Sequence, residues 1–271
     1  MTLPYWIRTA RLTFGIAGQT GVRTDGLRLS FRIERTHRSS ANSAEITIYN
    51  GAKATREAAV AKHAVVSLEA GYENQTYGIF SGTVDTAEVK LERPDWIIKL
   101  QCRDGSLGMQ TSSLYTTFPA GTAKLTVVQA LCSALQLASI GAQETSMLAG
   151  GITAPLVVSG SVRKALDQCA ADWGFWWSIQ DGLVEIREPH GRGANWRLAP
   201  KLTATSGLIG SPEKTDEGWR LRTLLDGRLR PGERCQVEST TLTGVVQLKA
   251  VTHSGDTHGS DWYTEAVGVE T

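Results

Sequence analysis

The feature that most constrains the fold of this chain is a strict alternation of apolar and polar residues in short runs. Residues 27–33 (LRLSFRI) place an apolar side chain at every second position, and residues 44–49 (AEITIY) do the same. A side-chain period of two is that of a strand with one buried and one exposed face. The polar stretch between the two runs suits a turn, so together they predict a β-hairpin.

Further runs extend the β pattern over much of the chain. Residues 52–62 are an exception, because they are rich in Ala, Lys, Arg and Glu and predict a short helix. The sequence therefore predicts an α+β protein that is mainly β. Further strands are expected at about residues 64–71, 77–86, 95–103, 219–225, 235–238, 245–251 and 262–267.

The middle of the chain has a different pattern. Apolar residues at helical spacing predict an amphipathic helix over about 125–135. A second helix is expected to begin after Ser161, a suitable N-cap, and to end at Gly174. Asp181 and Gly182 then separate two strand-like runs, which is a strong hairpin signal. The pattern predicts a compact helix–helix–hairpin module.

Loop-like segments divide the chain into three parts. Residues 106–122, rich in Ser, Thr and Gly, and residues 189–193 are predicted to be linkers. The predicted domains are a first β-barrel or sandwich domain at 1–108, an inserted α/β domain at 120–188 and a second β domain at 196–271.

Charge is balanced over the whole chain but not along it. The 271 residues carry 28 Lys and Arg against 27 Asp and Glu, which excludes a strongly basic nucleic-acid coat and a disordered acidic chain. Residues 1–60 carry nine basic and four acidic side chains, whereas residues 201–271 carry eight basic and ten acidic ones. This difference has two interpretations. Opposite electrostatic potentials could orient subunits head to tail, or the charged residues could simply lie on ordinary solvent-exposed surfaces.

The sequence contains no signal for export, membrane insertion or catalysis. Pro4, Arg8 and Arg11 interrupt any signal-peptide core, so we expect no membrane anchor. The four Cys residues are widely spaced and are expected to be small buried side chains. Nucleophile-elbow, phosphate-loop and zinc-protease motifs do not occur in the sequence. We therefore expect no catalytic residues and no cofactor.

The densest polar cluster lies at residues 253–261 (HSGDTHGSD). His253, Asp256 and His258 offer two imidazoles and a carboxylate, which are ligands that Zn²⁺ accepts. The cluster also lies between two strand-like runs and is rich in Gly, Asp and Ser, as hairpin loops are. A hairpin loop is the preferred interpretation, and a metal site is the alternative.

A second cluster consists of Trp173, Trp176 and Trp177 at the predicted junction of helix and hairpin. Aromatic rings in such a place can stack a sugar or a base. They can also close a small core or dock a partner, which is the preferred interpretation. Strand alternation predicts that Trp176 and Trp177 lie on opposite faces of their strand.

Three stretches of the sequence, taken in their order along the chain, carry a resemblance to a known family. They resemble the first tube-like domain, the inserted domain and the C-terminal part of baseplate hub proteins of contractile-tailed bacteriophages (late control D-like tail hubs). Together they cover nearly the whole chain. The stretches are residues 29–35 (LSFRIER) and 42–50 (NSAEITIYN), then 165–174 (ALDQCAADWG) and 177–186 (WSIQDGLVEI), then 224–237 (LLDGRLRPGERCQV) and 251–264 (VTHSGDTHGSDWYT).

The resemblance implies a structural virion protein of the tail baseplate, assembled in the host cytoplasm. Three copies would form a homotrimer in which two tube-type β-barrel domains per chain make a pseudo-sixfold ring. This ring would join the sixfold tail tube to the threefold central spike and line a channel for genomic DNA, without sequence-specific binding. The implied partners are the tail tube and central spike proteins, with tape measure and wedge proteins as further candidates.

Within this interpretation, the predicted subunit or partner contacts are Trp173, Trp176, Trp177, Asp256 and Trp262. One alternative function is a cell-wall-degrading enzyme of the phage injection apparatus. Another is a sheet-based nucleic-acid binder that uses the basic N-terminal segment, which the near-zero net charge disfavours.

Overall fold

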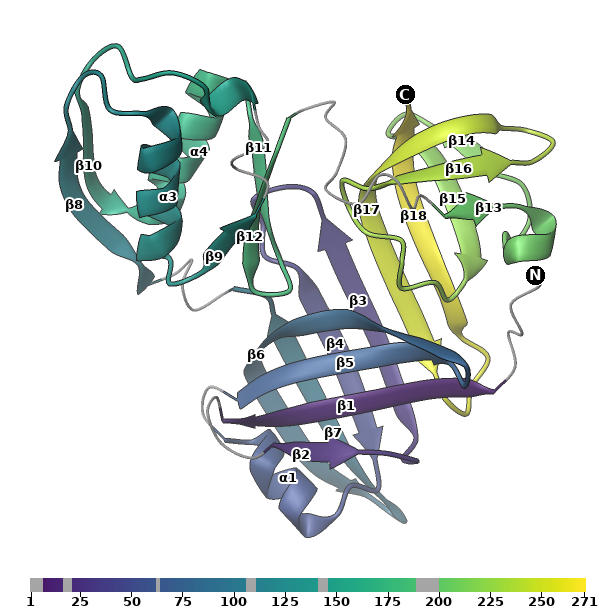
Figure 1. The fold of residues 1–271 in the computed structure, drawn as a ribbon. Coiled ribbons are helices and arrows are strands. Elements are labelled where there is room, and N and C mark those ends of the chain that lie inside the picture. The colour runs from purple at the N-terminus through teal and green to yellow at the C-terminus, as the bar shows by residue number, and fades with distance from the viewer. Residues whose placement is uncertain (1–6, 17–20, 62–63, 106–110, 141–145, 189–199) are drawn as a thin grey trace. The chain divides into compact units, whose positions relative to one another are not determined.

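The computed structural model describes residues 7–16, 21–61, 64–105, 111–140, 146–188 and 200–271, which form two compact units (Figure 1). The first, called the sheet unit, comprises the described parts of Met1–Thr36, Asn42–Asp104 and Asn195–Thr271. The second, called the insert unit, comprises the described parts of His37–Ala41 and Gly105–Ala194.

The first β region of the sheet unit follows the alternation of the sequence. In β3, Leu29, Phe31 and Ile33 are buried, whereas Arg32 and Glu34 are exposed. The predicted hairpin is present, because β3 pairs antiparallel with the next strand. The elements are β1 (Arg8–Ile16), β2 (Val22–Thr24), β3 (Leu29–Thr36), β4 (Ser43–Tyr49), α1 (Lys53–Ala59), β5 (Ala64–Tyr72), β6 (Gln75–Glu92) and β7 (Asp95–Arg103).

The second β region of the sheet unit lies C-terminal to the insert. Pro231 and Gly232 form a tight turn, with Gly232 at φ 80° and the Glu233 amide donating to the Arg230 carbonyl over 3.2 Å. The elements are β13 (Lys201–Leu202), the 3₁₀ helix η4 (Ala204–Ser206), β14 (Glu213–Thr215), β15 (Gly218–Leu224), β16 (Arg234–Glu238), β17 (Thr243–Asp256) and β18 (Trp262–Glu270).

One sheet joins the two β regions. Its strand order is β14-β15-β18-β17-β3-β4-β7-β6-β5-β1-β2; β16 also pairs with β17, and β13 pairs with β16. The regions meet where β17 pairs antiparallel with β3, from Ala250 opposite Thr36 to Asp256 opposite Ser30 (Figure 1). The α+β, mainly β class is confirmed. The strands of the described residues form an open path and do not close into a barrel within one chain.

The insert unit is a two-helix module with small sheets. Ser161 caps α4, its hydroxyl accepting from the Lys164 amide over 3.5 Å, and Gly174 ends the helix in the left-handed region at φ 76°. Asp181 and Gly182 form the predicted two-residue hairpin. The elements are β8 (Ser113–Phe118), α3 (Lys124–Ala134), β9 (Ala138–Ile140), η2 (Ser146–Leu148), β10 (Leu156–Ser161), α4 (Val162–Trp173), β11 (Trp176–Gln180) and β12 (Leu183–Arg187).

Three apolar clusters form the cores of the protein. The first lies mainly in the first β region and includes Leu225 and Trp262 of the second, another lies in the second β region, and the third lies in the insert unit. The four cysteines are buried and free, as the sequence predicted, and contribute to these clusters.

The linker predictions have different outcomes. The segment 106–122 is not wholly a linker, because β8 occupies Ser113–Phe118 and pairs with β10 along its length. Strands of alternating polar and apolar residues resemble loops when the polar positions are Ser and Thr. Residues 189–193 lie outside the described residues. The boundaries at 1–108, 120–188 and 196–271 stay a prediction.

The helices in the described part of the chain are too short or too polar to span a lipid bilayer.

Candidate assembly surface

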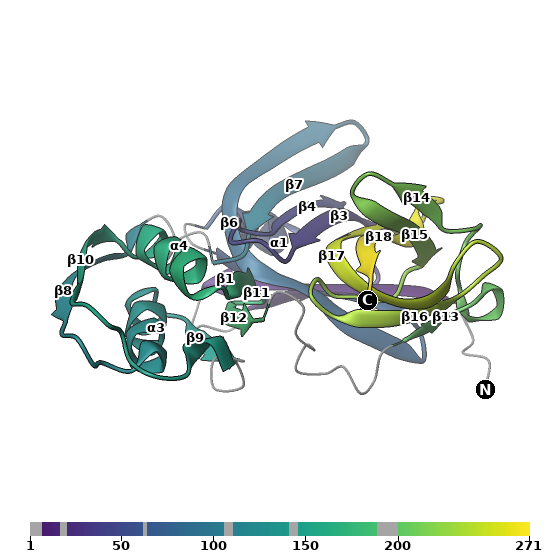
Figure 2. The same ribbon diagram turned by 90° about the horizontal axis from the view of Figure 1, so that it is seen from above.

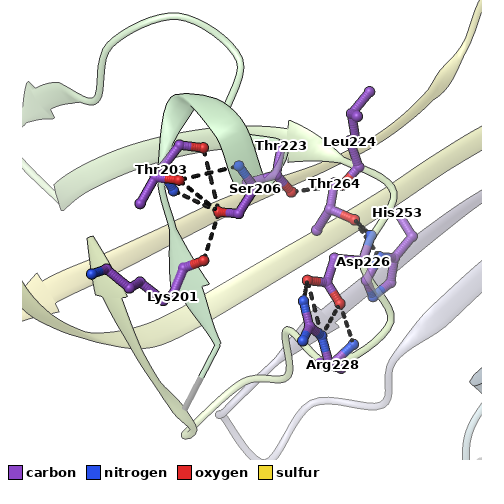
Figure 3. Close-up of polar contacts among 9 residues, drawn as sticks. All are labelled: Lys201, Thr203, Ser206, Thr223, Leu224, Asp226, Arg228, His253 and Thr264. Carbon is purple, nitrogen blue, oxygen red and sulfur yellow. Dashed lines mark hydrogen bonds and ion pairs between the residues drawn. The ribbon is translucent and has the colours of Figure 1, made fainter. Parts of the chain in front are cut away.

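A buried polar network stabilises the junction between the two β regions (Figure 3). His253 of β17 and Thr264 of β18 are both fully buried, and His253 Nδ1 lies 2.9 Å from Thr264 Oγ1. The backbone amide of Asp226 donates to the same hydroxyl over 3.0 Å. The network therefore links two strands to the loop that follows β15.

That loop is held in one shape by Asp226 and Arg228 (Figure 3). The Asp226 carboxylate is buried and accepts from Arg228 Nε at 2.9 Å, from Arg228 Nη2 at 2.7 Å and from the Arg228 amide at 3.0 Å. Between them, Gly227 lies against β6: a Cβ there would lie 2.6 Å from Tyr77 Cβ and 2.9 Å from Ile79 Cγ2. Only glycine permits this close approach between the two β regions.

Arg35 of β3 is part of the same junction. Its side chain is buried, and its Nη1 donates to the Ile79 carbonyl over 3.1 Å. Burial, together with the positive charges of Arg35 and Arg230, lowers the pKa of His253 to about 3. His253 is therefore neutral at physiological pH.

The start of the second β region has its own polar support (Figure 3). The Thr203 hydroxyl accepts from the Ser206 amide over 3.1 Å, and the Ser206 hydroxyl accepts from the Thr203 amide over 2.7 Å. This reciprocal capping box fixes η4. The Ser206 hydroxyl also donates to the Lys201 carbonyl over 2.7 Å, which ties η4 to β13.

The structure separates the three predicted metal ligands. His253 is a strand residue in the core rather than a loop residue, because β17 continues to Asp256. His258 is exposed in the turn that follows. Across the described ranges, no group of three His, Cys, Asp or Glu side chains is placed to hold a metal ion. A hairpin connection joins β17 to β18 as expected, but it comprises residues 257–261 only, because residues 253–256 belong to β17.

Asp256 instead organises the turn between β17 and β18. Its carboxylate forms an ion pair with Arg28 at 2.8 Å and accepts from the amides of His258 and Gly259, each at 2.9 Å. Burial acts to raise the pKa of Asp256, but the hydrogen bonds from Arg28 and the two amides outweigh it, so the pKa is lowered. Asp256 is therefore ionised and shapes the turn.

Trp262 supports this turn from inside the protein. Its indole is 3% exposed and lies edge-on to Phe31, with ring centroids 5.6 Å apart. The Arg8 guanidinium lies 5.7 Å from its ring centroid and donates to the Gly259 carbonyl over 2.6 Å. Because the Trp262 indole is buried, a subunit or partner contact predicted here would involve the β17–β18 turn that Trp262 supports, rather than the indole itself. The contact roles of Asp256 and Trp262 stay predictions.

The three tryptophans of the insert unit have different environments. Trp177 is buried, and its Nε1 donates to Asp167 Oδ1 over 3.0 Å. Trp176, one residue earlier on β11, is 36% exposed, which confirms the predicted opposite faces. Trp173 is half-buried at the end of α4, 6.3 Å from the Phe175 ring. Their role as partner contacts stays a prediction.

One surface that the sequence motifs do not reveal is the arm formed by β6 and β7. β5 pairs with β6 only as far as Thr83, so residues 84–92 pair with β7 alone among the described strands. The other edge of this segment leaves backbone groups without a strand partner in the described part of the chain. In Figure 2 the arm extends beyond the neighbouring strands of its sheet.

The arm also has an apolar face. Ala87 and Val89 are partly buried against the apolar cluster of the first β region, whereas Leu91 at the tip of the arm is 47% exposed. Leu91 pairs with Trp96, over which the Arg56 guanidinium lies at 4.2 Å. The sequence does indicate this longer strand, because the alternation of apolar and polar residues continues through residues 86–92 (TAEVKLE), beyond the strand end predicted near 86.

Three buried thiols are poorly suited to act as nucleophiles. Burial raises the pKa of Cys102 to about 12, and the nearby carboxylate of Asp85 adds to the rise. Burial likewise raises the pKa of Cys235 to about 12 and that of Cys169 to about 11. These thiols are protonated at physiological pH and are therefore poor nucleophiles.

Comparison with known proteins adds a family and several similar folds. The model of the family described as baseplate hub gp41 matches residues 9–245. No curated protein matches the sequence. The fold is similar to that of the 43 kDa tail protein of prophage MuSo2 from Shewanella oneidensis, with a TM-score of 0.68 and 9% identity over 97% of this chain and 98% of that chain.

Two further structures share the fold. A tail protein from Neisseria meningitidis has a TM-score of 0.66 and 11% identity, and the match covers 97% of both chains. An Escherichia coli component of the type VI secretion system, described as structurally similar to T4 bacteriophage tail proteins, has a TM-score of 0.63 and 10% identity. That match covers 95% of this chain and 76% of the other.

Proposed function

Because the chain belongs to the baseplate hub gp41 family and has a structural role in a phage baseplate, we propose that three copies form its hub ring. The ring joins the sixfold tail tube to the threefold central spike and lines the channel through which DNA leaves. Its partners are the tail tube and spike proteins, with tape measure and wedge proteins as outer contacts. It is assembled in the host cytoplasm and acts in the virion.

The observation that carries this proposal is the open sheet of a single chain. Two β regions are joined by the pairing of β17 with β3, yet their strands do not close on themselves in the described residues. An exposed edge such as that of residues 84–92 favours pairing with another chain. Three chains with two β regions each would place six similar β regions around one axis. The ring would close when the exposed strand edges of each chain pair with the neighbouring chain.

Charge supports a head-to-tail order in this ring. The N-terminal 60 residues have an excess of five basic groups, and residues 201–271 have an excess of two acidic groups. A first β region that faces the second β region of the neighbouring chain would place opposite potentials together, which favours one orientation and register.

A passive role agrees with the chemistry of the described residues. The thiols of Cys102, Cys169 and Cys235 are held protonated, and the buried imidazole of His253 is held neutral. We propose that the protein acts by its geometry and does not catalyse a reaction.

The proposal is tested by sedimentation velocity of the full chain and of Leu91→Glu. The native chain is expected to form trimers, and the new charge at the tip of the arm is expected to shift the equilibrium to monomers. Val157→Glu is the matched control, because Val157 is 68% exposed but lies in the insert unit. A native chain that stays monomeric at all concentrations, or equal weakening by both variants, would contradict the proposal.

A further inference from the structure

A pocket of about 420 Å³ opens in the insert unit, and its lining mixes aromatic rings with polar groups. This volume falls within the range of about 300–1,000 Å³ that is typical of small-molecule sites. The assembly role proposed above makes no use of it. The lining residues are His37, Arg38, Ser39, Asp167, Ala170, Phe175, Trp176 and Trp177.

The aromatic part of the pocket combines two buried rings with one that is partly exposed. Phe175 and Trp177 are buried in the core of the insert unit, and the bond from Trp177 to Asp167 fixes the orientation of the indole. Trp176 is 36% exposed and lies beside the His37 ring, with centroids 4.9 Å apart and planes inclined by 53°. The pocket therefore presents a large ring surface that the core does not cover.

The polar part of the pocket retains hydrogen-bonding capacity. Arg38 is exposed and makes no hydrogen bond or ion pair with the described residues. Asp167 is 43% exposed at its side chain; Oδ1 accepts from Trp177, while Oδ2 lies 3.9 Å from Arg163 Nε. The Ser39 hydroxyl also lies in the lining. A ligand would therefore meet a guanidinium donor, a carboxylate acceptor and a hydroxyl that serves as both.

The charges of the pocket select a neutral ligand. An anion would be attracted to Arg38 but repelled by Asp167, and a cation would meet the reverse. The insert unit as a whole carries six basic and six acidic side chains, so it lacks the excess positive charge that attracts nucleic acid. A ligand without net charge that is rich in groups able to donate and accept hydrogen bonds fits both side chains.

We infer that this pocket binds a neutral saccharide. The C–H groups on one face of a pyranose ring carry small positive charges and are attracted to the electron-rich face of an indole such as Trp176. Its hydroxyls donate to Asp167 and accept from Arg38, and Ser39 can do either. This site would let a baseplate component bind a neutral glycan.

The test uses the full-length protein on an array of neutral oligosaccharides built from glucose, galactose, mannose and N-acetylglucosamine. The best oligosaccharide is then measured by isothermal titration against Trp176→Ala and Arg38→Ala. The matched control is Tyr115→Ala, because Tyr115 is 75% exposed in the same unit but does not line the pocket. Trp176→Ala is expected to weaken binding about tenfold or more, as for other stacked rings, and Arg38→Ala severalfold, with Tyr115→Ala unchanged.

Arg38→Ala keeps the test decisive if Trp176→Ala fails to fold, because Arg38 is exposed and makes no hydrogen bond or ion pair with the described residues. Absence of binding to every oligosaccharide would overturn the inference. It would also be overturned if Tyr115→Ala weakened binding as much as the pocket variants, or if a ten-residue peptide or a dT10 oligonucleotide bound more tightly than any saccharide. None of these outcomes bears on trimer formation, so the inference and the proposed function fail independently.

Discussion

The sheet unit and the insert unit are stabilised in different ways. Of the buried polar side chains in the described residues, only Ser178 and Gln180 belong to the insert unit. The sheet unit buries the others, among them Arg35, Asp226 and His253, which lie at the junction of its two β regions. Apolar contact is non-directional, whereas hydrogen bonds fix a geometry. The difference indicates that the junction specifies one arrangement of the two β regions.

The largest expected effect tests whether the two units are independent. Leu166→Ala removes a buried side chain of α4 and is expected to lower the free energy of unfolding of the insert unit by about 2–5 kcal/mol. Ile46→Ala is the reciprocal variant in the sheet unit. Peptide-resolved hydrogen exchange should show lost protection in the substituted unit alone. Lost protection in both units would show that the two units are not stabilised independently.

The second prediction concerns pH and the polar junction. The pKa of His253 is lowered to about 3 in the fold, below its ordinary 6.5, so the unfolded chain binds a proton first as the pH falls. Stability is therefore expected to fall by up to about 1.4 kcal/mol per pH unit below 6.5. Chemical denaturation between pH 7 and 5, where most carboxylates stay ionised, should show this slope.

His253→Gln is expected to remove most of that slope, because Gln does not titrate. His258→Gln, at an exposed imidazole in the neighbouring turn, should leave it in place. An equal slope in the native chain and in His253→Gln would show that the imidazole does not control acid stability.

A third, smaller effect is expected at Gly227. Ala there must displace Tyr77 or Ile79, since its Cβ would lie 2.6 Å and 2.9 Å from their side-chain atoms. The cost of such overpacking is about 1–3 kcal/mol, measured by urea unfolding of the sheet unit. Gly78→Ala on β6 is the control, because a Cβ there meets nothing within 4 Å. Similar losses in both variants would contradict a tight contact between the β regions.

The smallest effect is expected at the β17–β18 turn. Asp256→Asn removes the charge that pairs with Arg28 and weakens the bonds from two backbone amides, which should cost about 1 kcal/mol in a partly exposed site. Asp261→Asn, an exposed carboxylate in the same turn, should have little effect. Thermal unfolding measures both, and equal midpoints would show that Asp256 does not shape the turn.

The sequence was most informative where local rules decide structure. Ser161 and Gly174 bound α4 because capping needs only neighbouring backbone groups, and Asp181 with Gly182 form the predicted turn. Trp176 and Trp177 point to opposite faces because a strand has period two. Such features depend on a few adjacent residues.

The parts that the sequence did not reveal depend on distant contacts. His253 was assigned to a loop because Gly and Ser surround it, yet pairing with β3 and β18 extends β17 through it. The burial of Arg35 depends on acceptors far along the chain, such as the Ile79 carbonyl. The pocket of the insert unit combines residues 37–39 with α4 and β11, which no local pattern connects.

The most direct test of the account is an electron cryomicroscopy reconstruction of the assembled protein. The account predicts three chains around a central channel, with the open edge of residues 84–92 covered by a neighbouring chain. A particle without threefold symmetry and a channel, or one in which that edge remains open to solvent, would contradict it.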